Sequence, residues 1–166
     1  MGGASDDGGS SGHAVPAPST EATGPLPAQI DATVEVGADP IGIAPGEGSL
    51  WVVNAEIDAA QGTVTRIDPA TGEVLTTVDV GVVPLQVAVG EGGVWVSNSD
   101  DDTVSRIDPS SDEVVAEIDV LAEATVADHG LINPNQVMAF EDRSLWLPIL
   151  DDGVVLRVAP PATTVE

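Results

Sequence analysis

The residues best suited to bind a metal ion lie in the stretch Asn98-Ser-Asp100-Asp-Asp102. Amide and carboxylate oxygens at alternate positions open the calcium-binding loops of proteins, because Ca²⁺ prefers several oxygen ligands. The match ends there, since Thr103 stands where such a loop needs glycine and Pro109 stands where it needs glutamate. Asn98, Asp100 and Asp102 are therefore weak candidates for a Ca²⁺ site, and the acidic turn of a highly charged surface explains the run as well.

A second candidate for chemistry is His129, which follows Asp128 in a polar stretch and is the only histidine beyond the N-terminal segment. A histidine beside a carboxylate can act as a general acid or base, although a solvent-facing loop residue also fits. The chain has no cysteine, and it contains no nucleophile elbow, phosphate-binding glycine loop or zinc spacing. No catalytic set emerges, so the sequence leaves an enzymatic activity open and favours none.

Acidic residues dominate the charge of the chain. Its 166 residues include 28 Asp and Glu against four Arg and no Lys, which gives a formal charge of −24. Such a surface repels phosphates, which excludes nucleic acid as a partner. No run of 18 apolar residues occurs, so we expect no membrane-spanning segment. The charge favours cations, basic proteins or uncharged ligands as partners, or solubility in high salt.

The N-terminal segment, residues 1–29, consists mainly of Gly, Ser, Pro, Ala and Thr without apolar periodicity. Such a segment cannot bury enough surface to offset the entropy lost on ordering, and we predict a disordered tether. It resembles the stretch that follows the lipidated cysteine of bacterial lipoproteins, although it has neither a lipobox nor a signal peptide. That resemblance implies an extracytoplasmic location.

Three similar units follow the tether, at about residues 30–80, 81–120 and 121–166. In each unit a Pro precedes a Trp by 11 or 12 residues, and the Trp precedes an Arg by 11 or 15. The repeated residues are Pro40, Trp51 and Arg66 in the first unit, Pro84, Trp95 and Arg106 in the second, and Pro134, Trp146 and Arg157 in the third.

Each unit divides into four short apolar runs separated by turn residues, as in a β-meander. In the second unit these runs cover residues 86–89, 94–98, 103–107 and 113–120. Four strands at a period of about 44 residues are the signature of a β-propeller blade. The predicted fold is therefore all-β, with three blades of four antiparallel strands.

The second unit resembles the YVTN and NHL repeats of bacterial β-propellers, in which a unit of the form P…G.vWV.N…tVsrID…g.vv.tI.vG recurs. The resemblance covers about residues 30–166 and is weaker in the third unit, where Ile149 and Ala159 replace Asn98 and Asp108. Streptogramin lyases have a similar architecture and work with a histidine and a metal. This chain lacks their Trp-Phe pair and a second histidine outside the tether, so the resemblance does not imply their activity.

Both length irregularities of the repeat fall on one rim of the predicted blades. In an antiparallel blade, the turn between strands two and three and the link to the next blade share one rim, here called the loop rim, and the other two turns form the hairpin rim. The loop rim gains residues at 55–62 and within 121–133, and insertions on a rigid scaffold often carry binding function. The predicted binding residues are Glu56, Asp58, Asp100, Asp102, Asp128, His129, Asp151 and Asp152.

The repeated Trp and Arg residues have a predicted structural role. Three of the four Arg occupy one repeat position, which favours ion pairs within or between blades over ligand binding. The three Trp are expected to anchor the core, because a sugar-binding rim would need further aromatic residues. This interpretation covers Trp51, Trp95, Trp146, Arg66, Arg106 and Arg157.

Three blades do not close a ring, because propellers use four to eight. Residues 30–36 (IDATVEV) match the fourth strand of a blade, and the sequence ends at ATTVE, where a last fourth strand begins. The chain is then a partial propeller, a stable three-blade arc, or half of a six-bladed homo-oligomeric ring. In that ring, residues 30–36 of one chain complete the blade begun by residues 137–158 of the other.

These observations favour a non-enzymatic, extracytoplasmic propeller module that binds a protein or a small uncharged or cationic ligand at the loop rim. No cofactor is expected beyond the weak Ca²⁺ candidate. The alternative is a metal-dependent enzyme of the lyase or lactonase kind that uses the rim carboxylates and His129. A structural role within a larger surface protein also fits.

Overall fold

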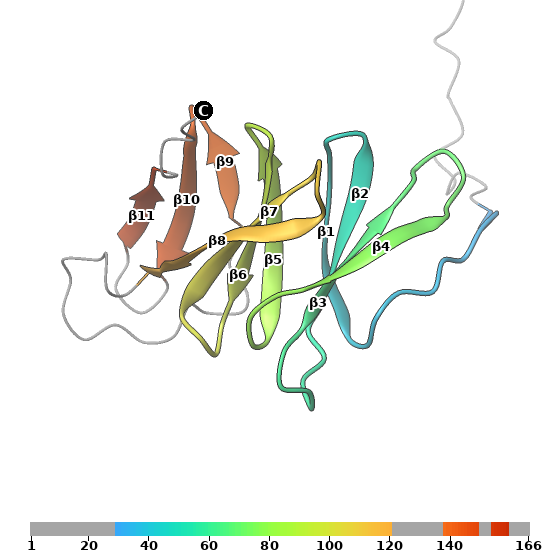
Figure 1. The fold of residues 1–166 in the computed structure, drawn as a ribbon, viewed down its shortest axis with the longest axis horizontal. Helices are drawn as coiled ribbons and strands as arrows, with labels where there is room; N and C mark the ends of the chain where they lie inside the picture. The colour runs from blue at the N-terminus through green and yellow to red at the C-terminus, as the bar shows by residue number, and fades with distance from the viewer. Residues whose placement is uncertain (1–28, 121–137, 150–153, 160–166) are drawn as a thin grey trace, which may run out of the picture. The chain divides into compact units, whose positions relative to one another are not determined.

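The structure is a computed structural model that describes residues 29–120, 138–149 and 154–159. By its internal contacts the chain divides into two compact units, residues 1–31 and residues 32–166. All eleven strands of the described residues lie in the second unit (Figure 1). The predicted all-β fold is confirmed. In the described part of the chain, no helix has the length and apolar character needed to cross a membrane.

The strands form three antiparallel sheets, the first two with four strands and the third with three. The first sheet contains β1 (Pro40–Gly46), β2 (Ser49–Asn54), β3 (Thr63–Ile67) and β4 (Val74–Asp79). The second contains β5 (Pro84–Gly90), β6 (Gly93–Asn98), β7 (Thr103–Asp108) and β8 (Glu113–Asp119). The third contains β9 (Ala139–Glu141), β10 (Ser144–Ile149) and β11 (Val154–Val158). The four runs predicted for the second unit match β5 to β8 to within two residues at each end.

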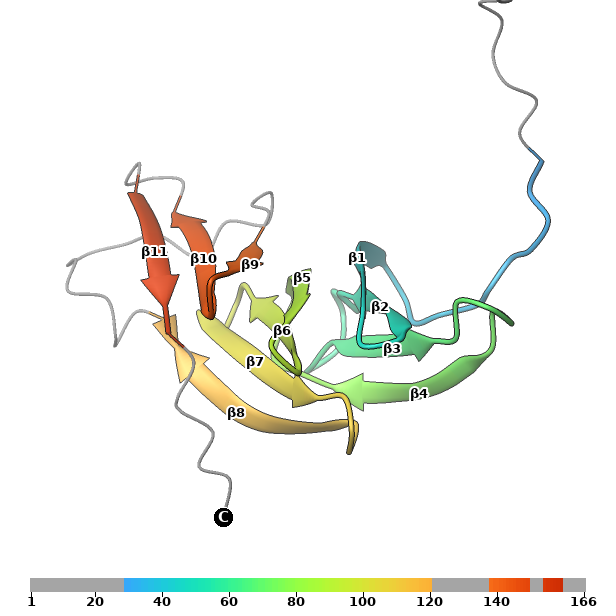
Figure 2. The same cartoon turned by 90° about the horizontal axis from the view of Figure 1, so that it is seen from above.

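Each sheet is a meander in which consecutive strands pair, as a propeller blade requires, and we call the three sheets blades 1, 2 and 3. The register repeats as well, because Trp51 lies opposite Arg66, Trp95 opposite Arg106, and Trp146 opposite Arg157. First strands neighbour first strands, with β1 beside β5 and β5 beside β9, as Figure 2 shows from above. The three units are therefore the same structural element three times over.

Tight turns join the first two strands of blades 1 and 2. Glu47 and Gly48 have φ of 49° and 70°, and Glu91 and Gly92 have φ of 51° and 66°. Two consecutive positive φ values are the mark of a type I′ hairpin, whose twist matches that of the flanking strands. The glycine at the second position supplies this conformation without steric cost, so these Gly-rich stretches are structural turns.

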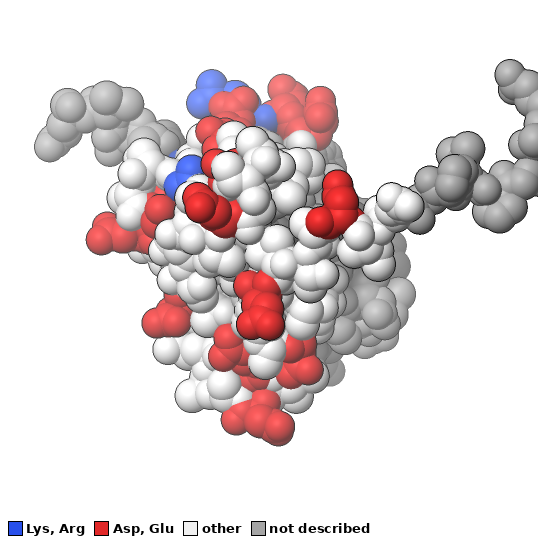
Figure 3. All heavy atoms as spheres, turned by 90° about the vertical axis from the view of Figure 1, so that its right-hand side faces the viewer, with Lys and Arg blue, Asp and Glu red and all other residues white. Residues whose placement is uncertain are grey.

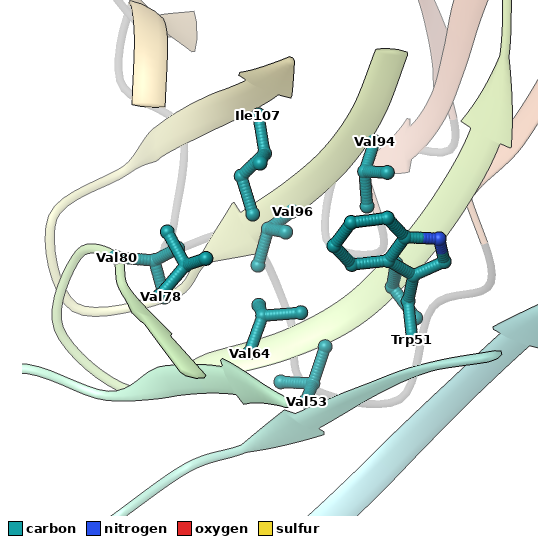
Figure 4. Packing of buried hydrophobic residues seen from close by; sticks show 9 residues of the cluster. Trp51, Val53, Val64, Val78, Val80, Val94, Val96 and Ile107 are labelled. Carbon is teal, nitrogen blue, oxygen red and sulfur yellow. The ribbon is translucent and has the colours of Figure 1, made fainter. Parts of the chain in front are cut away.

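Every blade presents two different apolar faces, which we name after their main residues. The Trp face of blade 1 (Trp51, Val53, Val64, Val78, Val80) packs against the Val face of blade 2 (Val87, Val94, Val96, Ile107). Figure 4 shows the Trp51 indole and the Val53 and Val64 side chains directed at Val94 and Val96. Since both faces of blade 2 are covered, its inner strands are apolar without alternation.

The interface between blades 2 and 3 repeats this arrangement. The Trp face of blade 2, with Ala88, Trp95, Val104 and Val120, meets the Val face of blade 3, with Met138, Leu145 and Leu147. The Trp95 ring also stacks on Phe140 of blade 3, with ring centroids 5.7 Å apart. Both interfaces thus place the Trp face of one blade against the Val face of the next.

The sheets do not close into a ring, since no described strand of blade 1 packs extensively against one of blade 3. Residues 29–36 form no strand within the single chain, and their role as the fourth strand of a blade in another copy stays a prediction. The physical reason is that a strand needs a hydrogen-bonded neighbour, and this segment could pair only with the third strand of a blade preceding blade 1. Among the described residues, no third strand of that kind lies beside this segment.

Candidate functional site

Backbone hydrogen bonds assemble the loop rim from segments far apart in the sequence. The N–H of Gly62 donates to the carbonyl of Gly81 at 2.9 Å, and the N–H of Val80 donates to the carbonyl of Gly62 at 3.0 Å. The link between blades 1 and 2 is held in turn by the second blade, because Ser99 N–H donates to the Val83 carbonyl at 3.0 Å. Loop 55–62, link 80–83 and turn 98–102 therefore form one continuous surface (Figure 1, lower edge).

Two predicted binding residues of loop 55–62 differ in their surroundings. Glu56 adopts a left-handed φ of 47°, and its Oε1 accepts a hydrogen bond from the Thr63 hydroxyl at 2.8 Å. The carboxylate of Glu56 thus ties the loop to the start of β3. Asp58 is exposed, next to Ile57, which is 62% exposed. Of the two acids, Asp58 is the more exposed to solvent.

The three acidic residues of turn 100–102 also differ in their hydrogen bonds. Asp101 Oδ2 accepts a hydrogen bond from the backbone N–H of Val82 at 2.6 Å, and a Cβ on Gly81 would lie 2.5 Å from the same oxygen. A glycine is therefore required beside this carboxylate. The carbonyl of Asp102 accepts from the N–H of Val120 at 3.0 Å, while Asp100 is exposed. The side chains of Asp100 and Asp101 are both exposed, and that of Asp101 also holds the link 80–83.

Asn98, the first residue of the weak calcium candidate, is fully buried. Its amide NH₂ donates to the hydroxyls of Thr103 and Ser105, both at 2.9 Å. Asn54 occupies the same place in blade 1 and donates to Thr63 at 3.0 Å and to Thr65 at 2.9 Å. In each blade, the asparagine side chain therefore joins strand two to strand three by two hydrogen bonds. Asn54 was missed as a structural residue, although its place at the end of WVVN, matching WVSN, was a usable signal.

The described carboxylates of this rim do not gather around a common point. In residues 29–120, 138–149 and 154–159, no group of three His, Cys, Asp or Glu side chains is placed to hold a metal ion. The other predicted binding residues, Asp128, His129, Asp151 and Asp152, lie outside the described residues.

The two rims differ in charge. Arg66, Arg106 and Arg157 lie at or near the ends of β3, β7 and β11 that reach the hairpin rim, and Arg143 lies in the β9–β10 turn. All four Arg of the chain are thus at the hairpin rim. On the face seen in Figure 3, the Arg side chains lie in the upper part. In the lower part, the only charged side chains of the described residues are those of Asp and Glu. The loop rim is therefore acidic without local cations.

The repeated Arg residues stack on the repeated Trp residues of their own blades. The guanidinium carbons of Arg66, Arg106 and Arg157 lie 4.9, 5.5 and 5.6 Å from the centroids of the Trp51, Trp95 and Trp146 rings. This cation–π contact follows from the register that places each pair on neighbouring strands. The sequence signal was present, because Trp and Arg recur together in all three units.

Arg66 also connects two blades. Its Nη1 donates to Asp112 Oδ1 at 2.7 Å and to the carbonyl of Pro109 at 2.8 Å, both in blade 2. Its Nε donates to the Ser49 hydroxyl at 2.9 Å within blade 1. The predicted ion pair thus forms across the interface and reaches Asp112, not the nearby Asp68.

Asp108 closes the β7–β8 turn at the hairpin rim. The hydroxyl of Ser110 donates to Asp108 Oδ1 at 2.7 Å and its backbone N–H donates at 2.8 Å. The side-chain bond, then the backbone bond and the charge of Arg106, hold the pKa of Asp108 below its ordinary value of 3.8. Because the folded pKa is lower than the unfolded one, the charged turn stabilises the fold above about pH 4, and this contribution disappears as the pH falls through the folded pKa.

We therefore expect Asp108→Asn to alter the acid dependence of stability. An asparagine oxygen still accepts hydrogen bonds but does not titrate, so the difference in melting temperature between the wild type and the variant should shrink from pH 6 to pH 3. Thermal unfolding followed by circular dichroism measures this. Glu47→Gln, at an exposed turn residue of the same rim, is the matched control. A difference that stays constant over this pH range would contradict the role given to Asp108.

Comparison with known proteins supports the fold. No protein-family model and no curated protein matches the chain. The glutaminyl cyclase of Myxococcus xanthus is similar over 72% of this chain and 54% of its own, with 18% identity and a TM-score of 0.46. The hydrazine synthase of Kuenenia stuttgartiensis is similar over 78% of this chain and 38% of its own, with 19% identity and a TM-score of 0.51.

At 19% identity the similarity to the hydrazine synthase concerns the fold alone, and that fold is β-propeller-like. The chain spans little more than half of the first protein and less than half of the second. Membership of the YVTN and NHL repeats in particular stays a prediction, because no family model matches.

Proposed function

We propose that the chain is a non-enzymatic, extracytoplasmic propeller module of the YVTN or NHL repeat type, which binds a cationic ligand or a basic protein segment at its loop rim. The observation that carries this proposal is the separation of charge. The exposed acids Asp58 and Asp100 lie on a rim without cations, while all four Arg lie at the other rim. The composition of residues 1–29 supports the extracytoplasmic location.

The rigidity of the loop rim also supports a binding role. The loops are tied to each other by backbone hydrogen bonds and by the carboxylates of Glu56 and Asp101, so a partner meets a preorganised surface. Preorganisation lowers the entropy lost on binding. With a net charge of −24, long-range attraction also accelerates the encounter with a basic partner.

A hexa-arginine peptide, titrated by calorimetry at low salt, tests this proposal. We expect binding that weakens in 0.3 M NaCl, because salt screens exposed charges. Asp58→Asn/Asp100→Asn should lower the affinity about fivefold, as expected for two lost charge contacts of about 0.5 kcal/mol each. Glu47→Gln/Glu73→Gln removes the same charge from exposed residues of the hairpin rim and should change the affinity less than twofold.

The result that overturns the proposal is equal weakening by both double variants, which would indicate attraction to the acidic surface as a whole. Absence of binding at low salt would also overturn it. Amide chemical shifts report the location independently, and we expect the largest changes in residues 55–62 and 98–102.

A further inference from the structure

The two ends of the row of blades leave one Trp face and one Val face without a partner. Trp146 of blade 3 is 37% exposed, whereas Trp51 and Trp95, at the same repeat position, are 0% and 1% exposed. Ile43 of blade 1 is 64% exposed, whereas the equivalent Val87 of blade 2 is 8% exposed. The exposed apolar side chains are those that both internal interfaces bury.

The free Val face of blade 1 contains a hollow of about 390 Å³. Its lining matches the Val face of blade 2, which is buried against blade 1. Its apolar wall is Ile43, Leu50, Val52 and Ile67, the equivalents of Val87, Val94, Val96 and Ile107, which receive Trp51 in blade 2. Another edge of the hollow includes Pro69 and Gly72. These are the equivalents of Pro109 and Asp112, which accept hydrogen bonds from Arg66. The hollow therefore fits a Trp–Arg stack such as Trp146 and Arg157.

Residues 33–36 (TVEV) already occupy one side of this hollow. Val34 and Val36 line it, just as Val78 and Val80 of TVDV cover the Val face of blade 2. They therefore lie where the fourth strand of a preceding blade belongs, although they pair with no described strand. The missing element is a third strand beside them.

Blade 3 has the complementary deficit. Among the described residues, β11 is the last strand of its sheet and pairs only with β10. Beside it lies a hollow of about 630 Å³, bordered by Ile118 of β8, by Val120 just after β8, and by Leu156 and Val158 of β11. An unpaired strand edge next to an apolar hollow is a site for strand addition.

We propose that a second copy of this chain fills both deficits at once. The Trp face of blade 3 docks on the Val face of blade 1 of the other copy, and residues 33–36 of that copy add to the edge of β11 as its fourth strand. Val64 lies opposite Val78 in blade 1 and Val104 opposite Ile118 in blade 2. The same register places Val155 opposite Val34 of the second copy. Arg157 then meets the Pro69 carbonyl, and no carboxylate, because Gly72 stands where blade 2 has Asp112.

Two copies are the number that closes this head-to-tail contact. The three described blades are too few for a ring, two copies of them supply six, and three copies would exceed the four to eight blades that propellers use. A heterologous contact that closes leaves no free edge for further growth. Residues 162–166 (ATTVE) also have the sequence of a fourth strand and are the competing occupant of the β11 edge.

Light scattering of the full chain provides the first measurement, and we expect twice the chain mass of 16.7 kDa. Trp146→Glu should give a monomer with an unchanged far-ultraviolet spectrum, because the side chain is partly exposed within one chain. The absence of cysteine allows a second test by crosslinking. Val34→Cys/Val155→Cys should form a disulfide between chains on oxidation, seen as a covalent dimer in a non-reducing gel.

Glu35→Cys/Val155→Cys is the matched control, because neighbouring residues of a strand point to opposite faces, and it should form at least fivefold less dimer. A wild-type monomer without crosslinks between chains would assign the β11 edge to the chain's own C-terminal residues and overturn the proposal. Assemblies larger than two copies would overturn it as well.

Discussion

Replacing Trp51 by alanine is expected to lower the free energy of unfolding by about 4 kcal/mol, the loss typical of a large aromatic removed from a packed core. Trp51 is completely buried and lies at the centre of the interface between blades 1 and 2. Its indole N–H donates to the carbonyl of Gly46 at 3.1 Å, and Arg66 lies over its ring. The substitution removes these contacts and leaves a cavity that two rigid sheets cannot close.

Urea denaturation at a fixed chain concentration measures this loss. Leu75→Ala is the matched control, because Leu75 on β4 is 51% exposed, and its expected cost is below about 1 kcal/mol. Similar losses for both variants would contradict the assignment of Trp51 to the centre of the interface.

The second large effect is expected for Arg66→Ala, which should cost about 3 kcal/mol, since removing one partner of a largely buried ion pair leaves the other without compensation. The side chains of Arg66 and Asp112 are 18% and 30% exposed. Solvent screening therefore keeps the expected loss at the lower end of the about 3–5 kcal/mol typical of a broken buried pair. The variant also loses the hydrogen bond to Ser49 within blade 1 and the one to the Pro109 carbonyl of blade 2, so blades 1 and 2 keep their apolar packing but lose these polar contacts.

Arg143→Ala provides the control for a lost positive charge. Arg143 is 81% exposed and lies 3.9 Å from Glu91, so we expect a change within about 0.5 kcal/mol. Equal melting temperatures for the Arg66 and Arg143 variants would refute the ion pair between blades. For Arg106, the sequence predicts a comparable structural role. Its closest described partners are the Trp95 ring and the Gly92 carbonyl at 3.5 Å, so a smaller loss is expected than for Arg66.

The strands were predictable because the information is local. Turn residues such as Glu47-Gly48 fix hairpins, and short apolar runs between them have room only for strands. The repeat then supplied the blade, since three copies of one pattern must form one structure. Residues 30–36 show the limit of this reasoning, because strand formation depends on a neighbour that lies outside the repeat.

The position of the loop rim was predictable, but the contacts of its acidic residues were not. Strand alternation places loop 55–62 and turn 98–102 on one rim, and the structure brings them together. Which acid is also tied to the backbone depends on donors elsewhere in the chain. Asp101 is exposed but accepts a hydrogen bond from the Val82 N–H, 19 residues away in sequence, and Asp58 is exposed in loop 55–62. The sequence pattern makes these acids look alike.

The sequence by itself determined the all-β fold, the three repeated blades and the excess of negative charge, because these properties follow from local pattern and composition. The tertiary structure decided which residues meet across blades. Arg66 and Asp112 are 46 residues apart, and only the packing of a Trp face on a Val face brings them to 2.7 Å. The same packing leaves Trp146 and Ile43 exposed, because an apolar face becomes buried only where a complementary blade lies against it.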